Sequence, residues 1–311
     1  MRFAIVGGGG LGCLFGGLLA RAGTDVTLIA RGANLEAICA RGLDVRLLEG
    51  EPFHVDIPAT DDPGEVGPVD AIFFCVKTYD VEAAARQVLP LIGPETLILP
   101  VQNGVEAADQ IGAIVGPEHV VLGVGISAAS VERPGYVVQK ALKNRARFGP
   151  DAATGGRRSA RIREALEAAG IGADDGAGVE RDLWEKFVFS TAALGYMSLS
   201  RLSAGQVLAS PEASEMFLRI TAEAEAVGQA RGVELPSGAA ERALDFLRFI
   251  AAANPDARGS MYFDLLAGKR LELEAINGAV IRLGRQYGIA APRNEVVYAG
   301  LKPYIDGPPA G

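Results

Sequence analysis

Residues 7–12 of this 311-residue chain, Gly-Gly-Gly-Gly-Leu-Gly, constrain the fold more than any other segment. They follow a short, wholly apolar run at residues 3–6, which is typical of a strand buried in a parallel sheet. Residues 11–22 then have helical composition and stop at Gly23, and residues 25–30 are predicted as a second strand. A strand, a glycine turn, a helix and a strand within about thirty residues indicate one βαβ unit.

The glycine run also has the spacing of a phosphate-binding turn, because Gly7, Gly9 and Gly12 satisfy GxGxxG. In such a turn the first glycine allows a tight bend, the second lets the backbone approach a pyrophosphate, and the third allows close helix packing. The helix that follows offers free N–H groups and the positive end of its dipole. The alternative is a merely flexible loop, but the βαβ context favours a ligand. We therefore predict a dinucleotide site at Gly7, Gly8, Gly9, Gly10, Leu11 and Gly12.

The end of the second predicted strand bears on which dinucleotide binds. NAD enzymes usually place Asp or Glu there to accept a hydrogen bond from the ribose 2′-hydroxyl. This chain has Arg31 instead. A guanidinium suits a 2′-phosphate through charge-assisted contacts. The pattern predicts NADP(H), and the alternative is that Arg31 is an ordinary surface arginine.

The rest of the chain divides into two parts. Up to residue 177 strands and helices alternate, whereas later residues show long helical patterns and no strand-like runs. The fold class predicted is α/β, with an N-terminal Rossmann-type dinucleotide-binding domain (1–177) followed by an all-helical C-terminal domain (178–311). Strands are expected at 71–76, 96–101, 120–126, 136–139 and 146–148, with a hairpin across 43–57. Helices are expected at 81–92, 180–200, 211–232, 239–253 and 271–287, and a last αβ unit, a helix followed by a strand, is expected at 158–177.

Composition excludes several classes of protein. The residues are 49% hydrophobic and the net charge is −8, so the chain is neither disordered nor suited to nucleic acid. Three cysteines (Cys13, Cys39, Cys75) and two histidines leave little material for a metal site, and none is predicted. Apolar stretches fall short of the ~18 residues of a membrane helix. The glycine run would break a signal-peptide helix. We expect a cytoplasmic protein without membrane contact.

Two polar residues follow predicted strands of the N-terminal domain. Lys77 comes after the strand at 71–76, and Asn103 comes after the strand at 96–101. Ligands of open α/β sheets bind at such strand ends. A polar residue after a strand is also common in any loop, so both interpretations stay open here.

The helical domain contains a lysine in its most apolar helix. Lys186 lies within Leu-Trp-Glu-Lys-Phe-Val-Phe-Ser, and Ser190 is its neighbour one turn later on the same face. Burial would lower the lysine pKa toward the range of a useful general acid. Alternatively, the lysine extends to solvent or forms a structural ion pair. Glu272 or Glu274 could orient such a lysine, although acids on amphipathic helices commonly face water.

Together these segments resemble the ketopantoate reductase (2-dehydropantoate 2-reductase) family. The resemblance covers nearly the whole chain and rests on several motifs in order. They are the GxGxxG turn, Cys75-Val76-Lys77-Thr78, Gln102-Asn103-Gly104, Leu183-Trp184-Glu185-Lys186, Ser260-Met261 with Asp264, and Glu272 before Ile276-Asn277-Gly278.

The resemblance implies NADPH-dependent reduction of a 2-keto acid to a 2-hydroxy acid, with hydride delivered at an interdomain cleft. The leading substrate is ketopantoate, reduced to pantoate in pantothenate biosynthesis. Lys186 would be the general acid, and Glu272 would lie near it and the cofactor. Substrate contacts would come from Asn103, Lys186, Ser190 and Ser260. The nicotinamide end would be lined by Lys77, Asn103 and Ala129.

This chain departs from the family where the substrate pocket is expected. The family usually has asparagine four and eight residues after the lysine and again farther on, whereas this chain has Ser190, Leu194 and Ala204. A less polar pocket favours a different, more apolar keto acid. A separate alternative is the related β-hydroxyacid dehydrogenase chemistry on the same architecture. A further alternative is a non-catalytic NADP(H)-binding redox sensor, against which the retention of Lys186 and Glu272 argues. The apolar helical domain also suggests a homodimer.

Overall fold

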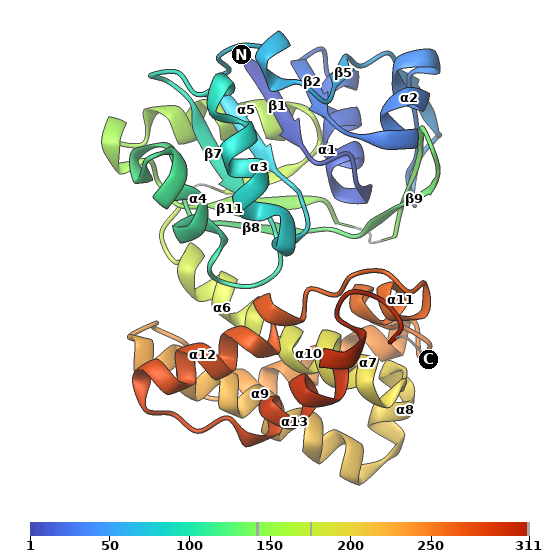
Figure 1. The fold of residues 1–311 in the computed structure, drawn as a ribbon, viewed down its shortest axis with the longest axis vertical. Helices are drawn as coiled ribbons and strands as arrows, with labels where there is room; N and C mark the ends of the chain where they lie inside the picture. The colour runs from blue at the N-terminus through green and yellow to red at the C-terminus, as the bar shows by residue number, and fades with distance from the viewer. Residues whose placement is uncertain (141–142, 175, 310–311) are drawn as a thin grey trace. The chain divides into compact units, whose positions relative to one another are not determined.

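The structure is a computed structural model that describes residues 1–140, 143–174 and 176–309. It divides into two compact units (Figure 1). The first comprises Met1–Gln102 and Glu106–Val179, and the second comprises Asn103–Val105 and Glu180–Gly311. The first contains sheets and helices, and the described part of the second is helical. The predicted α/β class with a helical C-terminal domain is confirmed.

A five-stranded parallel sheet forms the centre of the first unit, in the order β5-β2-β1-β6-β7. Its strands are β1 (Arg2–Val6), β2 (Asp25–Ile29), β5 (Ala59–Thr60), β6 (Ala71–Phe74) and β7 (Leu97–Pro100). The chain order reverses at β1, which pairs with β2 on one side and β6 on the other. In open parallel sheets this switch point is where ligands bind, beyond the carboxyl ends of the strands.

Alternating residues of β1 supply two separate cores. Phe3 and Ile5 join a cluster on one face of the sheet, and Ala4 and Val6 join a cluster on the other. This follows from the two-residue period of a strand and explains why its apolar run is continuous. The helices of this unit are α1 (Gly10–Arg21), α2 (Gly32–Arg41), α3 (Val81–Gln87), α4 (Ala107–Val115) and α5 (Arg157–Ala168) (Figure 1).

Two smaller sheets complete the first unit, in the orders β4-β3-β10-β9 and β12-β11-β8. Their strands are β3 (Leu43–Arg46), β4 (Phe53–Val55), β8 (Gly123–Ile126), β9 (Ala129–Arg133), β10 (Tyr136–Gln139), β11 (Arg145–Phe148) and β12 (Gly172–Asp174). The antiparallel pairing of β3 with β4 confirms the predicted hairpin. The strand expected at 120–126 is shorter, and β9 and α2 were not predicted because neither has a clear apolar period.

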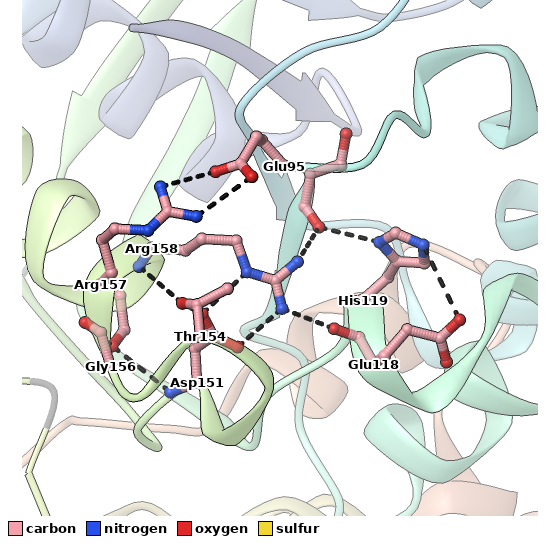
Figure 2. Close-up of polar contacts among 10 residues, drawn as sticks. Glu95, Glu118, His119, Asp151, Thr154, Gly156, Arg157 and Arg158 are labelled. Atoms are coloured by element: carbon pink, nitrogen blue, oxygen red, sulfur yellow. Dashed lines mark hydrogen bonds and ion pairs between the residues drawn. The ribbon is translucent and has the colours of Figure 1, made fainter.

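A buried arginine fastens α5 to one end of the central sheet (Figure 2). Arg158 donates to Asp151 through Nε at 2.8 Å and Nη2 at 2.6 Å, and both side chains are buried. It also donates to the backbone oxygens of Thr96 (3.1 Å) and Glu118 (2.7 Å). The guanidinium holds the pKa of the Asp151 carboxyl well below its usual range. Because every charge has a partner, this buried pair fixes the position of α5.

The second unit is built from helices separated by short turns. They are α6 (Val179–Ser190), a π-helix (Thr191–Tyr196), α7 (Met197–Ser200), α8 (Ala204–Ala209), α9 (Pro211–Arg231), α10 (Ala239–Ala253), α11 (Ser260–Leu266), α12 (Asn277–Tyr287) and α13 (Pro292–Leu301). The predicted helix at 271–287 is wrong in its first part. Leu273–Ala275 is a 3₁₀ turn and Ile276 has ψ −93°, so the α-helix begins at Asn277.

The predicted helix at 180–200 is also interrupted, by the π-helix. Asn277 Nδ2 donates to the Thr191 carbonyl at 3.1 Å and to Asn294 Oδ1 at 2.9 Å. Asn294 in turn donates to Glu223 at 2.8 Å. A helical turn widens where a side chain inserts into the backbone hydrogen-bond pattern, as Asn277 does at the Thr191 carbonyl. Gly195 makes room, since a Cβ there would lie 2.8 Å from the Asn277 Cγ.

Within residues 1–140, 143–174 and 176–309, no helix combines the length and apolar character needed to cross a membrane.

Candidate active site

The glycine loop, residues 7–12, connects β1 to α1 and is held closely by its surroundings. Gly7 has φ +114°, and a Cβ there would lie 2.9 Å from the backbone of Cys75 and Val76. A Cβ on Gly12 would strike the Gly7 carbonyl oxygen. At Gly10 it would meet the backbone of β9, 2.9 Å from the Ser130 nitrogen. These glycines are therefore required by close packing of backbone against backbone.

Gly9 differs from its neighbours because it is exposed and nothing lies within 4 Å of where its Cβ would be. It is also the N-cap of α1 and offers no side chain to the first N–H groups of that helix. Open space beside free N–H groups and a positive helix end suits a phosphate. The loop thus fits the pyrophosphate of a dinucleotide, and the contact of Gly9 with it stays a prediction.

Asn34 supports this loop, and the sequence patterns did not single it out. Its Nδ2 donates to the Gly8 carbonyl at 2.6 Å, and its Oδ1 accepts from the Gly135 N–H at 2.8 Å. One side chain therefore holds the glycine loop against the turn before β10. No local motif in α2 marks its single asparagine as a residue that holds the loop.

Arg31 follows β2 directly, at the position expected for a residue that reads the ribose 2′ group. It is the N-cap of α2, and its side chain is 82% exposed. Its Nη2 lies 2.6 Å from Oδ2 of Asp80. The sequence pattern pointed to the arginine but not to this carboxylate, which lies 49 residues away in the chain.

Lys77 and Ala129, predicted near the nicotinamide, also belong to the first unit. Lys77 is half-buried after β6 and precedes the 3₁₀ turn Thr78–Asp80. Ala129 begins β9, and its carbonyl lies against Gly10. Ala129 therefore contacts the glycine loop directly. Lys77 follows Cys75 and Val76, whose backbone lies against Gly7 of that loop. Their contacts with a cofactor stay predictions.

In the second unit Lys186, Glu272 and Asn103 form a group that we call the lysine cluster. Asn103 Nδ2 donates to Glu272 Oε2 at 3.4 Å. Glu272 is 6% exposed and Lys186 is half-buried on α6. Burial lowers the pKa of the Lys186 ammonium to about 8, and the charge of Glu272 partly opposes this. A charged group with a pKa near neutrality is a plausible proton donor in catalysis.

The structure separates the two glutamates that the sequence left as alternatives. Glu274 accepts hydrogen bonds from Tyr298 at 2.7 Å and from Lys302 at 2.5 Å. Glu272 is the one that interacts with Lys186. Glu272 precedes the 3₁₀ turn Leu273–Ala275 and is buried, whereas Glu274 lies within that turn and is exposed. The sequence suggested one regular helix there.

The two serines expected to contact the substrate, and the two other positions where the family usually has asparagine, lie in different settings. Ser190 is buried, and its hydroxyl donates to the Lys186 carbonyl at 2.7 Å. Ser260 is exposed at the start of α11. Leu194 lies in the π-helix, and its Cδ2 would be 2.6 Å from a Cβ on Gly259, just before Ser260. Ala204 is fully buried at the start of α8. The substrate roles of Ser190 and Ser260 stay predictions.

Two protein-family models match most of the chain. The one named Ketopantoate reductase PanE/ApbA matches residues 3–152, and the one named Ketopantoate reductase PanE/ApbA C terminal matches residues 178–304. The chain belongs to the ketopantoate reductase family. The resemblance predicted from the motifs is thereby confirmed. Membership makes the chain an oxidoreductase of the keto-acid-reducing kind with a nicotinamide dinucleotide as cofactor.

Individual relatives agree with this assignment. A 2-dehydropantoate 2-reductase of Halobacterium salinarum is 30% identical, over 94% of this chain and 95% of the relative. A solved PanE/ApbA family ketopantoate reductase from Ralstonia eutropha JMP134 is 32% identical, covers 98% of both chains and has a TM-score of 0.89. D-mandelate dehydrogenase, solved with NADH and anilino(oxo)acetate, also has a TM-score of 0.89, but at 22% identity that likeness concerns the fold alone.

Proposed function

We propose that this protein is an NADPH-dependent reductase that converts a 2-keto acid to a 2-hydroxy acid, with 2-dehydropantoate as the leading substrate. The observation that carries the proposal is the lysine cluster. It combines an ammonium whose pKa is about 8 with a buried carboxylate and an amide that orients that carboxylate. A keto acid reductase needs such a group beside the carbonyl oxygen.

The proton is the part of the reaction that this cluster supplies. Reduced nicotinamide, when bound, provides the hydride that attacks the keto carbon, so negative charge develops on the carbonyl oxygen. The Lys186 ammonium stabilises that charge and donates the proton from Nζ. With a pKa of about 8 the lysine is largely protonated at neutral pH, yet it releases the proton more readily than an exposed lysine.

Glu272 acts on the lysine, and Asn103 acts on Glu272. The carboxylate favours the charged form of Lys186 and so limits the pKa decrease that burial causes. The Asn103 amide donates to Glu272 and restricts the orientation of its carboxylate. Gly104, the residue after Asn103, allows this segment to pack against the 3₁₀ turn that follows Glu272. A Cβ on Gly104 would lie 2.8 Å from the Ala275 carbonyl oxygen in that turn. We assign Lys186 the general-acid role and Glu272 the role of holding it.

NADP(H) is the proposed cofactor because of Arg31. The guanidinium lies directly after β2, where NAD enzymes usually carry an acid, and it is exposed enough to meet a 2′-phosphate. The Arg31→Ala variant is expected to bind NADPH about 10- to 100-fold more weakly and NADH unchanged. Equal loss for both cofactors, measured by titration, would reject the NADP(H) assignment.

Two features of the second unit bear on the substrate and favour different answers. The Ser190 hydroxyl already donates a hydrogen bond to the Lys186 carbonyl. A ligand group that contacts the Ser190 hydroxyl oxygen therefore has to be a donor. The hydroxyl of 2-dehydropantoate is such a donor. Leu194, by contrast, cannot hydrogen-bond a substrate and favours a more apolar keto acid. Both substrates would undergo the same reaction at Lys186.

A matched pair of keto acids separates these alternatives. 2-Dehydropantoate and 3,3-dimethyl-2-oxobutanoate differ by one hydroxyl, and NADPH consumption gives kcat/KM for each. We expect about tenfold or greater preference for 2-dehydropantoate. Equal rates, or a preference for the apolar partner, would select the more apolar substrate class. NADPH binding without turnover of any keto acid, including pyruvate and phenylglyoxylate, would favour the redox-sensor alternative.

The remaining expectations concern assembly and location. A homodimer is tested by sedimentation, and a cytoplasmic location by cell fractionation; both stay predictions.

A further inference from the structure

We propose that Asp80 is a specificity-determining residue, because it competes with the cofactor 2′-phosphate for the guanidinium of Arg31. The inference rests on the proposed dinucleotide-dependent function. Its central observation is the 2.6 Å ion pair between Arg31 Nη2 and Asp80 Oδ2. A cation and an anion thus lie together at the place where the ribose 2′ group is read.

The backbone around Asp80 explains why its carboxylate is available to Arg31. Asp80 is the N-cap of α3, a position where aspartate commonly accepts a hydrogen bond from the helix backbone. It makes no such bond here. Its own N–H donates to the Lys77 carbonyl at 2.9 Å, which closes the turn that precedes the helix. The turn therefore presents the side chain to Arg31 instead of to α3.

The two partners differ in how firmly they are held. The Arg31 side chain is 82% exposed, and that of Asp80 is 27% exposed. Exposed ion pairs contribute little to stability, because solvent screens them and the long side chain loses freedom. Arg31 can therefore exchange partners at small cost. Asp80, on a short side chain at a hydrogen-bonded turn, keeps its negative charge nearby when Arg31 turns to a ligand.

This arrangement affects the two cofactors in opposite directions. The 2′-phosphate of NADPH gains Arg31 but meets the negative charge of Asp80 close by, which repels it. The 2′-hydroxyl of NADH can donate to the same carboxylate, as it does to the acid of NAD enzymes. Asp80 therefore narrows the preference for NADPH that Arg31 alone would produce.

Replacing Asp80 by asparagine tests this directly. Dissociation constants of NADPH and NADH are measured from the fluorescence of the bound nicotinamide, and those of 2′,5′-ADP and ADP by calorimetry. In Asp80→Asn we expect NADPH and 2′,5′-ADP to bind about tenfold more tightly and NADH several-fold more weakly. Thermal unfolding should match the wild type, because the side chain does not cap α3.

Asp25→Asn is the matched control. Asp25 starts β2, at the opposite end of the strand from Arg31, and it pairs with Arg2 at 3.7 Å. The charge change is the same, so the ratio of NADPH to NADH affinity should stay at the wild-type value. An equal shift in both variants, or none in Asp80→Asn, overturns the role of Asp80. If Arg31→Ala weakens both cofactors alike, the NADP(H) assignment itself fails, which is a separate result.

Discussion

The glycine loop and the lysine cluster reach functional geometry by different physical means. In the loop, Gly7, Gly10 and Gly12 approach neighbouring backbone so closely that no side chain fits. In the cluster, Lys186 and Glu272 act through charges whose strength depends on burial. Tolerance to mutation should differ accordingly. Added atoms should damage the loop, whereas lost or neutralised atoms should damage the cluster.

The largest effect is expected in the cluster. Lys186→Ala removes the proposed proton donor and should lower turnover about 10²–10⁴-fold, while cofactor affinity and thermal stability stay near wild type. Steady-state kinetics with the best keto acid measures this. Lys302→Ala is the control, because that lysine pairs with Glu274 and should leave turnover unchanged. Near-normal turnover in Lys186→Ala would reject the role.

The loop should respond to a single added methyl group in a position-dependent way. Gly12→Ala places Cβ against the Gly7 carbonyl, so we expect a loss of about 1–3 kcal/mol in unfolding free energy. Gly9→Ala meets open space and should keep stability within about 0.5 kcal/mol while weakening dinucleotide binding. Urea unfolding and cofactor titration distinguish the two. Equal destabilisation by both would show that Gly9 is structural.

Asn277 tests whether the π-helix beside the cluster depends on side-chain hydrogen bonds. Asn277→Ala leaves the Thr191 carbonyl and Asn294 without their partner, at a cost of about 1–3 kcal/mol in unfolding free energy. Gln229→Ala, an exposed amide on α9, should change it by less than about 0.5 kcal/mol. If both variants unfold alike, the buried network does not stabilise this region.

The last test is a pH dependence that only the cluster should confer. The reduction requires the Lys186 ammonium, whose pKa is about 8, so kcat/KM should be level below that pH and fall above it. Lys186→Arg keeps the charge to higher pH and should remove this decrease. A wild-type profile that stays level to pH 9.5 would contradict the lowered pKa.

The sequence predicted the loop better than the cluster. The GxGxxG turn is local, and its strand and helix adjoin it in the chain, so one pattern carries the prediction. The pairing of Lys186 with Glu272, in preference to Glu274, depends on the turn before α12. The sequence suggested a continuous helix there, because its apolar spacing persists through residues 271–276. Asn34, Asp80 and Asn277 were not assigned roles because each acts on a residue 26 or more positions away.

By itself, the sequence determined the βαβ unit, the α/β class with a helical C-terminal domain, and a family resemblance that the protein-family models confirm. These follow from hydrophobic period and glycine spacing, which are local properties. Only the tertiary structure decided that Asp80 meets Arg31, that Glu272 interacts with Lys186, and that the lysine pKa is about 8. Ion pairs and desolvation depend on distances between segments far apart in the chain, and those distances exist only in the folded protein.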